Sequence, residues 1–207
     1  MKKNKYKILA IISFLLFVLF SYLVKMNFFT SFDYNTTVKI QDRIPTFYDQ
    51  FLSLFSLIGS FEITFTILLV ILFFNKKLLF SVVTLASFVL AHIIELIGKM
   101  FLQHPGPPFM FFRYDLPFLF PSSYVQPGSS YPSGHSLRTV FIALITCGII
   151  FTSKRLTNSR KFYILVIAAI TAIMLLSRIS LGEHWTADVI GGMLIGISFG
   201  FLSLLFS

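Results

Sequence analysis

The sequence contains few charged residues and only one cysteine. Of its 207 residues, 12% are charged and only eight are Asp or Glu. A soluble domain of this size would need a more polar surface, so the composition argues against a soluble protein. The single Cys147 excludes an internal disulfide, and we expect it to be a packing residue because it lies in an apolar run. The sequence also has no repeat of fixed period and no low-complexity tract. Its length predicts a single domain that comprises residues 1–207.

Hydrophobic residues make up 56% of the chain and form six long apolar segments. Each has about 17–24 residues, enough for a helix to cross about 30 Å of hydrocarbon. The segments are Ile8–Val24, Phe51–Phe74, Leu78–Phe101, Ser136–Thr152, Phe162–Ser180 and Ala187–Phe206. The sequence therefore predicts an all-α, polytopic membrane bundle with six transmembrane helices. Residues 1–24 are expected to be a retained anchor, because no convincing cleavage site follows them, and the core is expected at about 50–207.

Basic residues are distributed unevenly along the chain. The formal net charge of +9 would raise the question of nucleic acid in a soluble protein. Here the basic residues cluster beside apolar segments, which membrane topology explains without a nucleic-acid partner. Ten of them fall on one predicted side: Lys2, Lys3, Lys5, Lys7, Lys76, Lys77, Lys154, Arg155, Arg160 and Lys161. The positive-inside rule makes that side cytoplasmic, so both termini are expected in the cytoplasm.

Two longer connections are predicted on the other, extracytoplasmic side. Residues 25–50 end in Arg43-Ile44-Pro45, which predicts an interfacial helix followed by a break. Residues 102–133 are rich in Pro, Gly, Ser and aromatics, which predicts a long irregular loop. Loops of this length in compact proteins are usually functional.

Polar residues at the predicted helix ends meet on this extracytoplasmic side. Such residues are costly within a membrane and therefore mark functional candidates. The candidates are Lys99, Ser133, Gly134, His135, Arg138, Arg178, His184 and Asp188. They come from the end of the third segment, the start of the fourth, the end of the fifth and the start of the sixth, so the topology alone predicts that they converge.

Four of these residues are suited to binding an anion. Arg178 and Lys99 are cations that bind phosphate oxygens, arginine through its fork and lysine as a point charge. Ser133 and Gly134 stand where a helix begins, so unpaired backbone N–H groups there can also hold an anion.

The two histidines differ in their surroundings. His184 and Asp188 are spaced i, i+4, which places both on one helix face. The carboxylate can hold the imidazole in one tautomer and make its other nitrogen a better nucleophile. His135 lies on a different helix and can protonate a leaving oxygen. The pair therefore fits the roles of nucleophile and acid.

These motifs resemble the type-2 phosphatidic acid phosphatase superfamily, which shares its site with vanadium haloperoxidases. The family signature has three blocks: Lys-x6-Arg-Pro, Pro-Ser-Gly-His and Ser-Arg-x5-His-x3-Asp. The second block stands intact at Pro132–His135 and the third at Ser177–Asp188. Order and six-helix layout also match, so the resemblance covers most of the chain from about residue 30.

The resemblance implies a two-step displacement at phosphorus. His184 forms a phosphohistidine, Asp188 orients it, and His135 protonates the leaving group and then activates water. The phosphate oxygens are held by Lys99, Ser133, Gly134 and Arg178. No metal and no other cofactor is implied.

The first block departs from the family pattern. Lys99 is followed by Gly106-Pro107 where the pattern has Arg-Pro, so one phosphate-binding arginine is missing. Arg138 is the first candidate to replace it, because it lies i+3 from His135 on the same helix face. Arg113, in the outer loop, is the second candidate. Alternatively, Arg138 pairs with Glu95 or Glu183 in a purely structural role.

The leading hypothesis is a membrane lipid phosphatase. Its substrate would be phosphatidic acid, phosphatidylglycerol phosphate or an isoprenyl diphosphate such as undecaprenyl diphosphate. A phosphotransferase with the same site, a pseudoenzyme disabled by Gly106, and an anion-binding or transport protein are the alternatives. The sequence leaves the lipid and the oligomeric state open. For Glu95 the sequence leaves an ion pair with Lys99 and a direct role in the site equally open, and it predicts that His104 is an ordinary loop residue.

Overall fold

The computed structural model describes residues 2–75, 77–118, 120–121 and 130–207. Lys76 and part of the predicted 102–133 loop lie outside the described residues. Helices form the regular structure of the described part. The α-helices are α1 (Lys2–Lys25), α2 (Thr30–Arg43), α3 (Asp49–Ser56), α4 (Phe61–Phe74), α5 (Leu78–Leu102), α6 (Gly134–Thr152), α7 (Arg160–Ser180) and α8 (Thr186–Leu204). Three short 3-10 helices are η1 (Thr46–Tyr48), η2 (Leu57–Gly59) and η3 (Phe109–Phe111).

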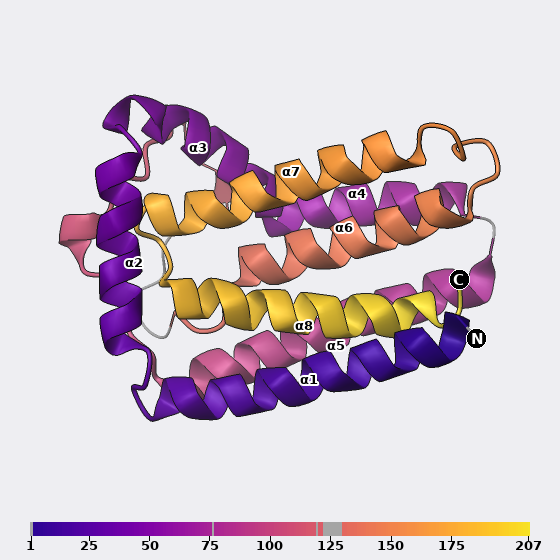
Figure 1. Ribbon diagram of the computed structural model, residues 1–207, viewed down its shortest axis with the longest axis horizontal. Helices are drawn as coiled ribbons and strands as arrows, with labels where there is room; N and C mark the ends of the chain where they lie inside the picture. Colours follow the sequence, from indigo (N-terminus) through magenta and orange to yellow (C-terminus); the bar gives the residue numbers. More distant parts are fainter. Residues whose placement is uncertain (1, 76, 119, 122–129) are drawn as a thin grey trace.

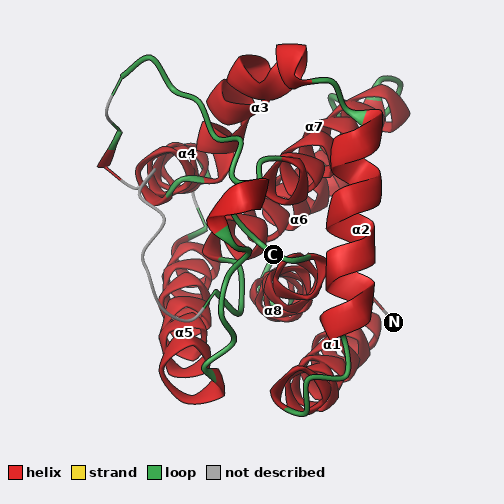
Figure 2. Ribbon diagram, turned by 90° about the vertical axis from the view of Figure 1, so that its left-hand side faces the viewer, coloured by secondary structure: helices red, strands yellow, loops and turns green. Residues whose placement is uncertain are grey.

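The long helices run side by side, and α8 lies in the middle of the bundle. It packs against α6, α1 and α5, and Figure 2 shows these helices around it, nearly end-on. Helix α2 crosses one end of the bundle, whereas both termini lie at the opposite end (Figure 1). Helices α1, α5, α6, α7 and α8 are long and apolar enough to span a membrane. This confirms the predicted all-helical membrane bundle.

The second predicted span, Phe51–Phe74, is wrong as a single straight helix. It is broken into two parts, Thr46–Gly59 and Phe61–Phe74, which are bent by 49°. Ser60 causes the break, because its backbone is extended and its side chain caps α4 by accepting a hydrogen bond from the Ile63 amide. The bend releases the Gly59 carbonyl from helical pairing, and that carbonyl accepts a hydrogen bond from Arg138 Nε at 2.9 Å.

Glycines allow α8 to approach α6 closely. A Cβ atom on Gly192 would overlap the Ser133 carbonyl oxygen, and one on Gly196 would overlap the Leu137 carbonyl oxygen. Small residues let helix backbones approach in this way. The Ser133 amide also donates to the Asp188 carbonyl at 3.0 Å, which ties the start of α6 to the start of α8.

Helix α2 is fastened across the end where the site residues lie. Asp33 Oδ1 accepts a hydrogen bond from the Ala187 amide at 2.8 Å, and so satisfies an unpaired donor at the start of α8. The Thr36 and Thr186 hydroxyls are 2.7 Å apart. Gln41 Nε2 donates to the Ser180 carbonyl at 3.0 Å, at the end of α7. The interfacial helix predicted within 25–50 therefore corresponds to α2, which covers the site end of the bundle.

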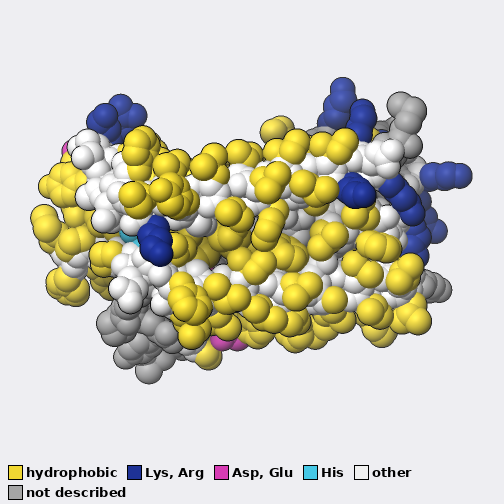
Figure 3. All heavy atoms as spheres, turned by 90° about the horizontal axis from the view of Figure 1, so that it is seen from below, with side chains coloured by type: hydrophobic (Ala, Val, Ile, Leu, Met, Phe, Trp, Pro, Cys, Tyr) yellow, Lys and Arg dark blue, Asp and Glu magenta, His cyan; other side chains and the backbone are white. Residues whose placement is uncertain are grey.

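The outer surface is apolar along the length of the bundle. Figure 3 shows hydrophobic side chains over the middle of one face, with Lys and Arg side chains gathered mostly at the right-hand end. Lys154, Arg155 and Lys161 lie between α6 and α7 or at the start of α7, at the end that carries both termini. This placement supports the cytoplasmic location of that end, which stays a prediction.

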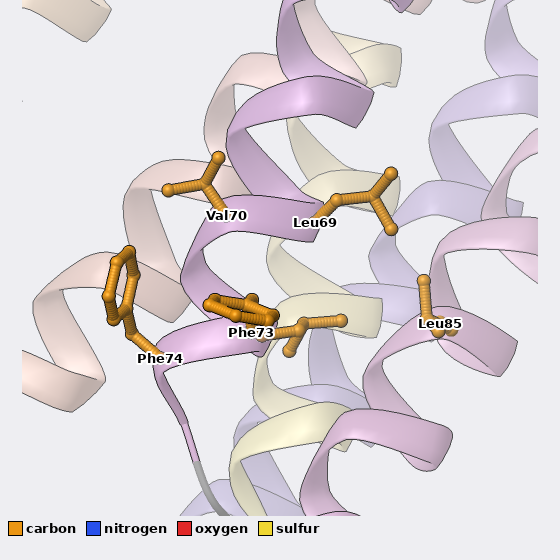
Figure 4. Close-up of a pocket in the computed structure, with 6 residues that line it drawn as sticks. Leu69, Val70, Phe73, Phe74 and Leu85 are labelled. Atoms are coloured by element: carbon orange, nitrogen blue, oxygen red, sulfur yellow. The ribbon is translucent and has the colours of Figure 1, made fainter.

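An apolar pocket of about 440 Å³ opens on α4 and α5. Its lining is Leu69, Val70, Leu72, Phe73, Phe74 and Leu85 (Figure 4). None of these side chains can bind phosphate or transfer a proton, so the chemistry must take place elsewhere.

Candidate active site

The predicted site residues come together at the α2 end of the bundle. His135 lies within electrostatic reach of Arg178, Arg138, His184 and Lys99, which come from the four expected helix ends. His135, Arg178 and Asp188 are buried. The structure therefore brings these residues together at one end of the bundle, as the predicted topology requires.

A serine hydroxyl connects His184 to Asp188. Ser130 Oγ lies 2.8 Å from His184 Nδ1 and donates to Asp188 Oδ2 at 2.7 Å. The direct distance from Nδ1 to Oδ2 is 3.5 Å, which is long for a hydrogen bond. Because Ser130 gives its one hydrogen to Asp188, it must accept from His184. His184 therefore carries its proton on Nδ1 and presents the lone pair of Nε2.

The Asp188 carboxylate has partners on both oxygens. Oδ2 also accepts from the Trp185 amide at 2.9 Å, and Oδ1 lies 2.9 Å from His104 Nδ1. Asp188 is fully buried, so these partners replace the water that a carboxylate would otherwise bind. His104, expected to be an ordinary loop residue, is thus a second imidazole on the carboxylate that supports His184.

The pKa values of the two histidines move in opposite directions. Burial lowers the pKa of His184, an effect that the Asp188 hydrogen bond opposes and the nearby Arg178 charge reinforces. Burial also lowers the pKa of His104, but the Asp188 hydrogen bond and the charges of Asp188 and Asp33 raise it above its ordinary value. His184 is therefore neutral near pH 7, which a nucleophile requires, whereas protonation of His104 is favoured.

His135 has the opposite tautomer to His184. Its Nδ1 lies 3.4 Å from Arg138 Nη2, and a guanidinium can only donate. Nδ1 must then be the acceptor, which leaves the proton on Nε2. One histidine thus presents a lone pair and the other an N–H donor. To act as an acid, His135 must first gain a second proton on Nδ1, because a neutral imidazole does not give up its remaining proton.

Arg138 is held in place by groups of the protein itself. Its Nε donates to the Gly59 carbonyl, and its Nη1 lies 3.5 Å from His92 Nε2 and 3.7 Å from Glu95 Oε2. The pairing with Glu95 corresponds to the structural alternative in the sequence analysis, and the pairing with Glu183 does not occur, because Glu183 binds Arg178 instead.

Arg113, the second candidate for the missing arginine, is occupied in a different place. Its Nε and Nη2 bind the Asp49 carboxylate at 3.0 and 2.8 Å, and it also donates to the Gln41 and Ile44 carbonyls. It therefore ties the outer loop to the end of α2 and the start of α3, which does not support a role in binding phosphate.

The remaining predicted cations each face a carboxylate. Lys99 Nζ is 2.7 Å from Glu95 Oε1. Arg178 binds both oxygens of Glu183 at 2.6 Å and also donates to the Ser56 hydroxyl. Arg178 Nε is buried and has no hydrogen-bond partner among the described residues. The hydrogen-bonding capacity of that donor is therefore unused among the described residues.

Ser133 and Gly134 form the start of α6, as predicted. The Ser133 side chain is the N-cap and accepts from the Ser136 amide, and Gly134 is the first residue of the helix. A helix N-terminus attracts anions through its unpaired amides and its dipole.

Sequence reasoning missed Ser130 and underestimated His104. Ser130 lies two residues before the Pro-Ser-Gly-His block, and no spacing rule connects it to Asp188. His104 follows Lys99 by five residues, and its basic character beside Pro105 was the one available signal.

Comparison with known proteins identifies a family. The family model described as the PAP2 superfamily matches residues 76–207. Phosphatidylglycerophosphatase B of Bacillus subtilis (strain 168) is 25% identical over 132 residues, which cover 63% of this chain and 60% of that protein. The match thus spans less than two thirds of the length of that relative.

Two solved structures share the fold. The crystal structure of a transmembrane PAP2-type phosphatidylglycerolphosphate phosphatase from Bacillus subtilis has a TM-score of 0.76 at 19% identity, and the match covers 94% of each chain. The crystal structure of Aquifex aeolicus LpxE has a TM-score of 0.62 at 22% identity and covers 84% of this chain and 94% of that one. Both likenesses concern the fold.

Proposed function

The chain belongs to the PAP2 superfamily, and from this premise we propose that it is an integral membrane phosphatase that removes phosphate from a lipid phosphate at the extracytoplasmic membrane face. The observation that carries the proposal is the pair of histidines with opposite tautomers. His184 is held through Ser130 and Asp188, and His135 lies beside it among Lys99, Arg138 and Arg178.

The reaction begins with attack of His184 Nε2 on phosphorus. As the Nε2–P bond forms, the bond from phosphorus to the leaving oxygen breaks, and His135 in its doubly protonated form gives its Nε2 proton to that oxygen and becomes a neutral imidazole. Lys99, Arg178 and the amides at the start of α6 hold the other phosphate oxygens, where charge spreads in the transition state. The positive charge that develops on His184 is stabilised through Ser130 by Asp188.

Water completes the cycle. It gives a proton to Nε2 of His135 as its oxygen attacks phosphorus, and the Nε2–P bond of His184 breaks. Inorganic phosphate leaves, His135 is again doubly protonated, and His184 is again neutral with its proton on Nδ1. This sequence needs no group beyond the side chains described and a water molecule.

A lipid substrate is supported by the position of the site. It lies at one end of a bundle of membrane-spanning helices, beneath α2, where a headgroup can arrive from the bilayer while its apolar tail remains in the hydrocarbon. Phosphatidylglycerol phosphate is the first substrate to test because the curated relative and one of the similar solved structures are named for it. Phosphatidic acid and undecaprenyl diphosphate complete the panel.

The test is phosphate release by the purified chain in detergent with a metal chelator present. We expect the wild type to release phosphate from at least one lipid of the panel, and His184→Ala to lose release by at least about 10⁴-fold, as expected when a nucleophile that acts with its partners is removed. Vanadate should inhibit the wild type, because it can adopt a trigonal bipyramidal geometry like that of the transition state.

Retention of turnover by a folded His184→Ala protein would contradict the assignment of the nucleophile. A wild type that binds the lipids but releases no phosphate would favour the binding or transport alternative. Melting temperatures of both proteins in the same detergent establish that each is folded.

A further inference from the structure

Two buried glutamates lie directly against the cations assigned to phosphate. Glu95 and Glu183 are only 5% and 4% exposed. Glu95 binds Lys99 at 2.7 Å and lies 3.7 Å from Arg138, and Glu183 binds Arg178 through both oxygens at 2.6 Å. Since buried charges are costly unless paired, these contacts stabilise the cations while no phosphate is bound.

The Glu95 carboxylate also lies close to Gly134, the first residue of α6. A Cβ atom on Gly134 would overlap Glu95 Oε1, and it would come within 2.8 Å of Glu95 Cδ and 2.9 Å of Arg138 Nη1. The absence of a side chain at Gly134 therefore lets an anionic group approach the helix N-terminus. In this structure that group is a carboxylate of the protein itself.

The three cations at the site cannot balance both glutamates and a phosphate group. Lys99, Arg138 and Arg178 supply three positive charges, and Glu95 and Glu183 supply two negative charges, so one positive charge remains. A phosphate monoester carries about −1.5 to −2 at pH 7. Like charges placed together in a desolvated site repel strongly. The phosphate must therefore compete with the carboxylates for the same donors.

The contacts of Arg178 show how the exchange between carboxylate and phosphate can occur at this cation. Its two Nη atoms bind Glu183, yet its Nε is buried without a hydrogen-bond partner in the described part of the chain. When a phosphate oxygen displaces a Glu183 oxygen from the guanidinium, Arg178 can turn toward the phosphate without breaking a hydrogen bond at Nε. Ser56, which accepts from the same guanidinium, keeps it in position.

We propose that Glu95 and Glu183 are internal counter-ions that occupy the phosphate-binding cations in the empty enzyme, give way to the phosphate of the substrate, and so set the affinity of the site for anions. The inference rests on the proposed function and adds two specificity-determining residues to it. It predicts a direction of change, because removing either negative charge must strengthen phosphate binding. Carboxylates that merely orient the cations would have the opposite effect, since their removal would loosen the cations and weaken binding.

The experiment compares Glu95→Gln and Glu183→Gln with the wild type. Each substitution removes a charge and keeps the side-chain shape and an oxygen acceptor. Two quantities are measured on the full chain in detergent: the inhibition constant for vanadate and the rise in melting temperature produced by vanadate or inorganic phosphate. The second needs no turnover, since any ligand that binds only the folded state raises its stability. Asp42→Asn is the matched control, because it removes an exposed carboxylate on α2.

We expect each glutamine variant to bind vanadate about tenfold more tightly than the wild type, as relief of like-charge repulsion implies, and the KM for the lipid phosphate to fall with it. The Asp42→Asn protein should match the wild type. If one glutamine variant does not fold, vanadate binding by the other variant tests the counter-ion role. Unchanged or weaker vanadate binding in folded variants would overturn the counter-ion role. Phosphate release by the wild type in the same experiment would still support the proposed function.

The counter-ion role can also hold where the proposed phosphatase function fails. If the wild type releases no phosphate but the variants bind vanadate more tightly, the phosphatase assignment fails and the counter-ion role stands. If neither the wild type nor the variants bind vanadate or phosphate, both proposals are overturned.

Discussion

Ser130→Ala tests whether a hydroxyl relay holds the nucleophile. Ser130 Oγ is 2.8 Å from His184 Nδ1 and 2.7 Å from Asp188 Oδ2, whereas the histidine and the carboxylate are 3.5 Å apart. Without the hydroxyl, the Nδ1 proton of His184 has no acceptor at hydrogen-bond distance in the observed geometry. The imidazole can then rotate or change tautomer, and either change removes the Nε2 lone pair from its position of attack.

The size of the effect follows from the interactions that are lost. A hydrogen bond to a charged group is worth about 1.5–3 kcal/mol, and about 1.4 kcal/mol in the activation free energy changes the rate tenfold. We therefore expect kcat to fall by about 10- to 100-fold. KM should change little, because Ser130 contacts His184 and Asp188 and not the cations that bind phosphate.

Steady-state kinetics on the best lipid of the panel measure both quantities. Ser203→Ala is the matched control, because Ser203 is a buried serine on α8 whose hydroxyl donates to the Phe199 carbonyl within its own helix. It should keep the wild-type kcat. An unchanged kcat in folded Ser130→Ala would refute the relay, since His184 would then reach Asp188 directly. A rise in KM with kcat unchanged would refute the assigned position of Ser130 behind the nucleophile.

Two further predictions concern the partners of the histidines. The pKa of His104 is raised in the folded chain, so its contribution to stability is complete below the ordinary histidine pKa of about 6.5 and is lost as the pH rises through the higher folded value. His104→Gln should therefore lower the melting temperature more at pH 6 than at pH 9. An equal loss at both pH values would contradict the charged pair with Asp188. Arg138→Gln should lower kcat by about tenfold or more, as loss of a charge-assisted contact to His135 implies, and unchanged turnover would show that Arg138 takes no part in catalysis.

Hydropathy predicts the helices of this fold because each span must satisfy its backbone hydrogen bonds within itself. The same argument fails within Phe51–Phe74, where Ser60 caps α4 and the Gly59 carbonyl pairs with Arg138. The partner that makes the break tolerable lies on α6, 79 positions away in the sequence. The hydropathy pattern of Phe51–Phe74 alone therefore gives no sign of this partner.

The residues of the site likewise include some that sequence spacing can pair and some that only the tertiary structure brings together. His184 and Asp188 can be paired from sequence because one helical turn separates them. Ser130 and His104 reach Asp188 across separations of 58 and 84 residues, through a loop that has no periodic signal. Polar groups at helix ends are thus predictable from the cost of burying them, but the groups that satisfy them in an irregular loop depend on tertiary packing.

Arg138 does not occupy the position of the arginine that is missing from the first block. A Cβ atom on Gly106 would lie 3.5 Å from Ser130 Cβ, so an arginine there would start beside the relay that holds His184. Arg138 approaches from α6 instead and contacts His135. A positive charge is thus found beside the proposed acid, whereas an arginine at position 106 would start on the side of the proposed nucleophile. The contact of Arg138 with Nδ1 favours a proton on Nε2 of His135, and Arg138 shares Glu95 with Lys99. Under the proposed function, the site therefore combines a cation beside the acid with cations that are partly neutralised before substrate arrives.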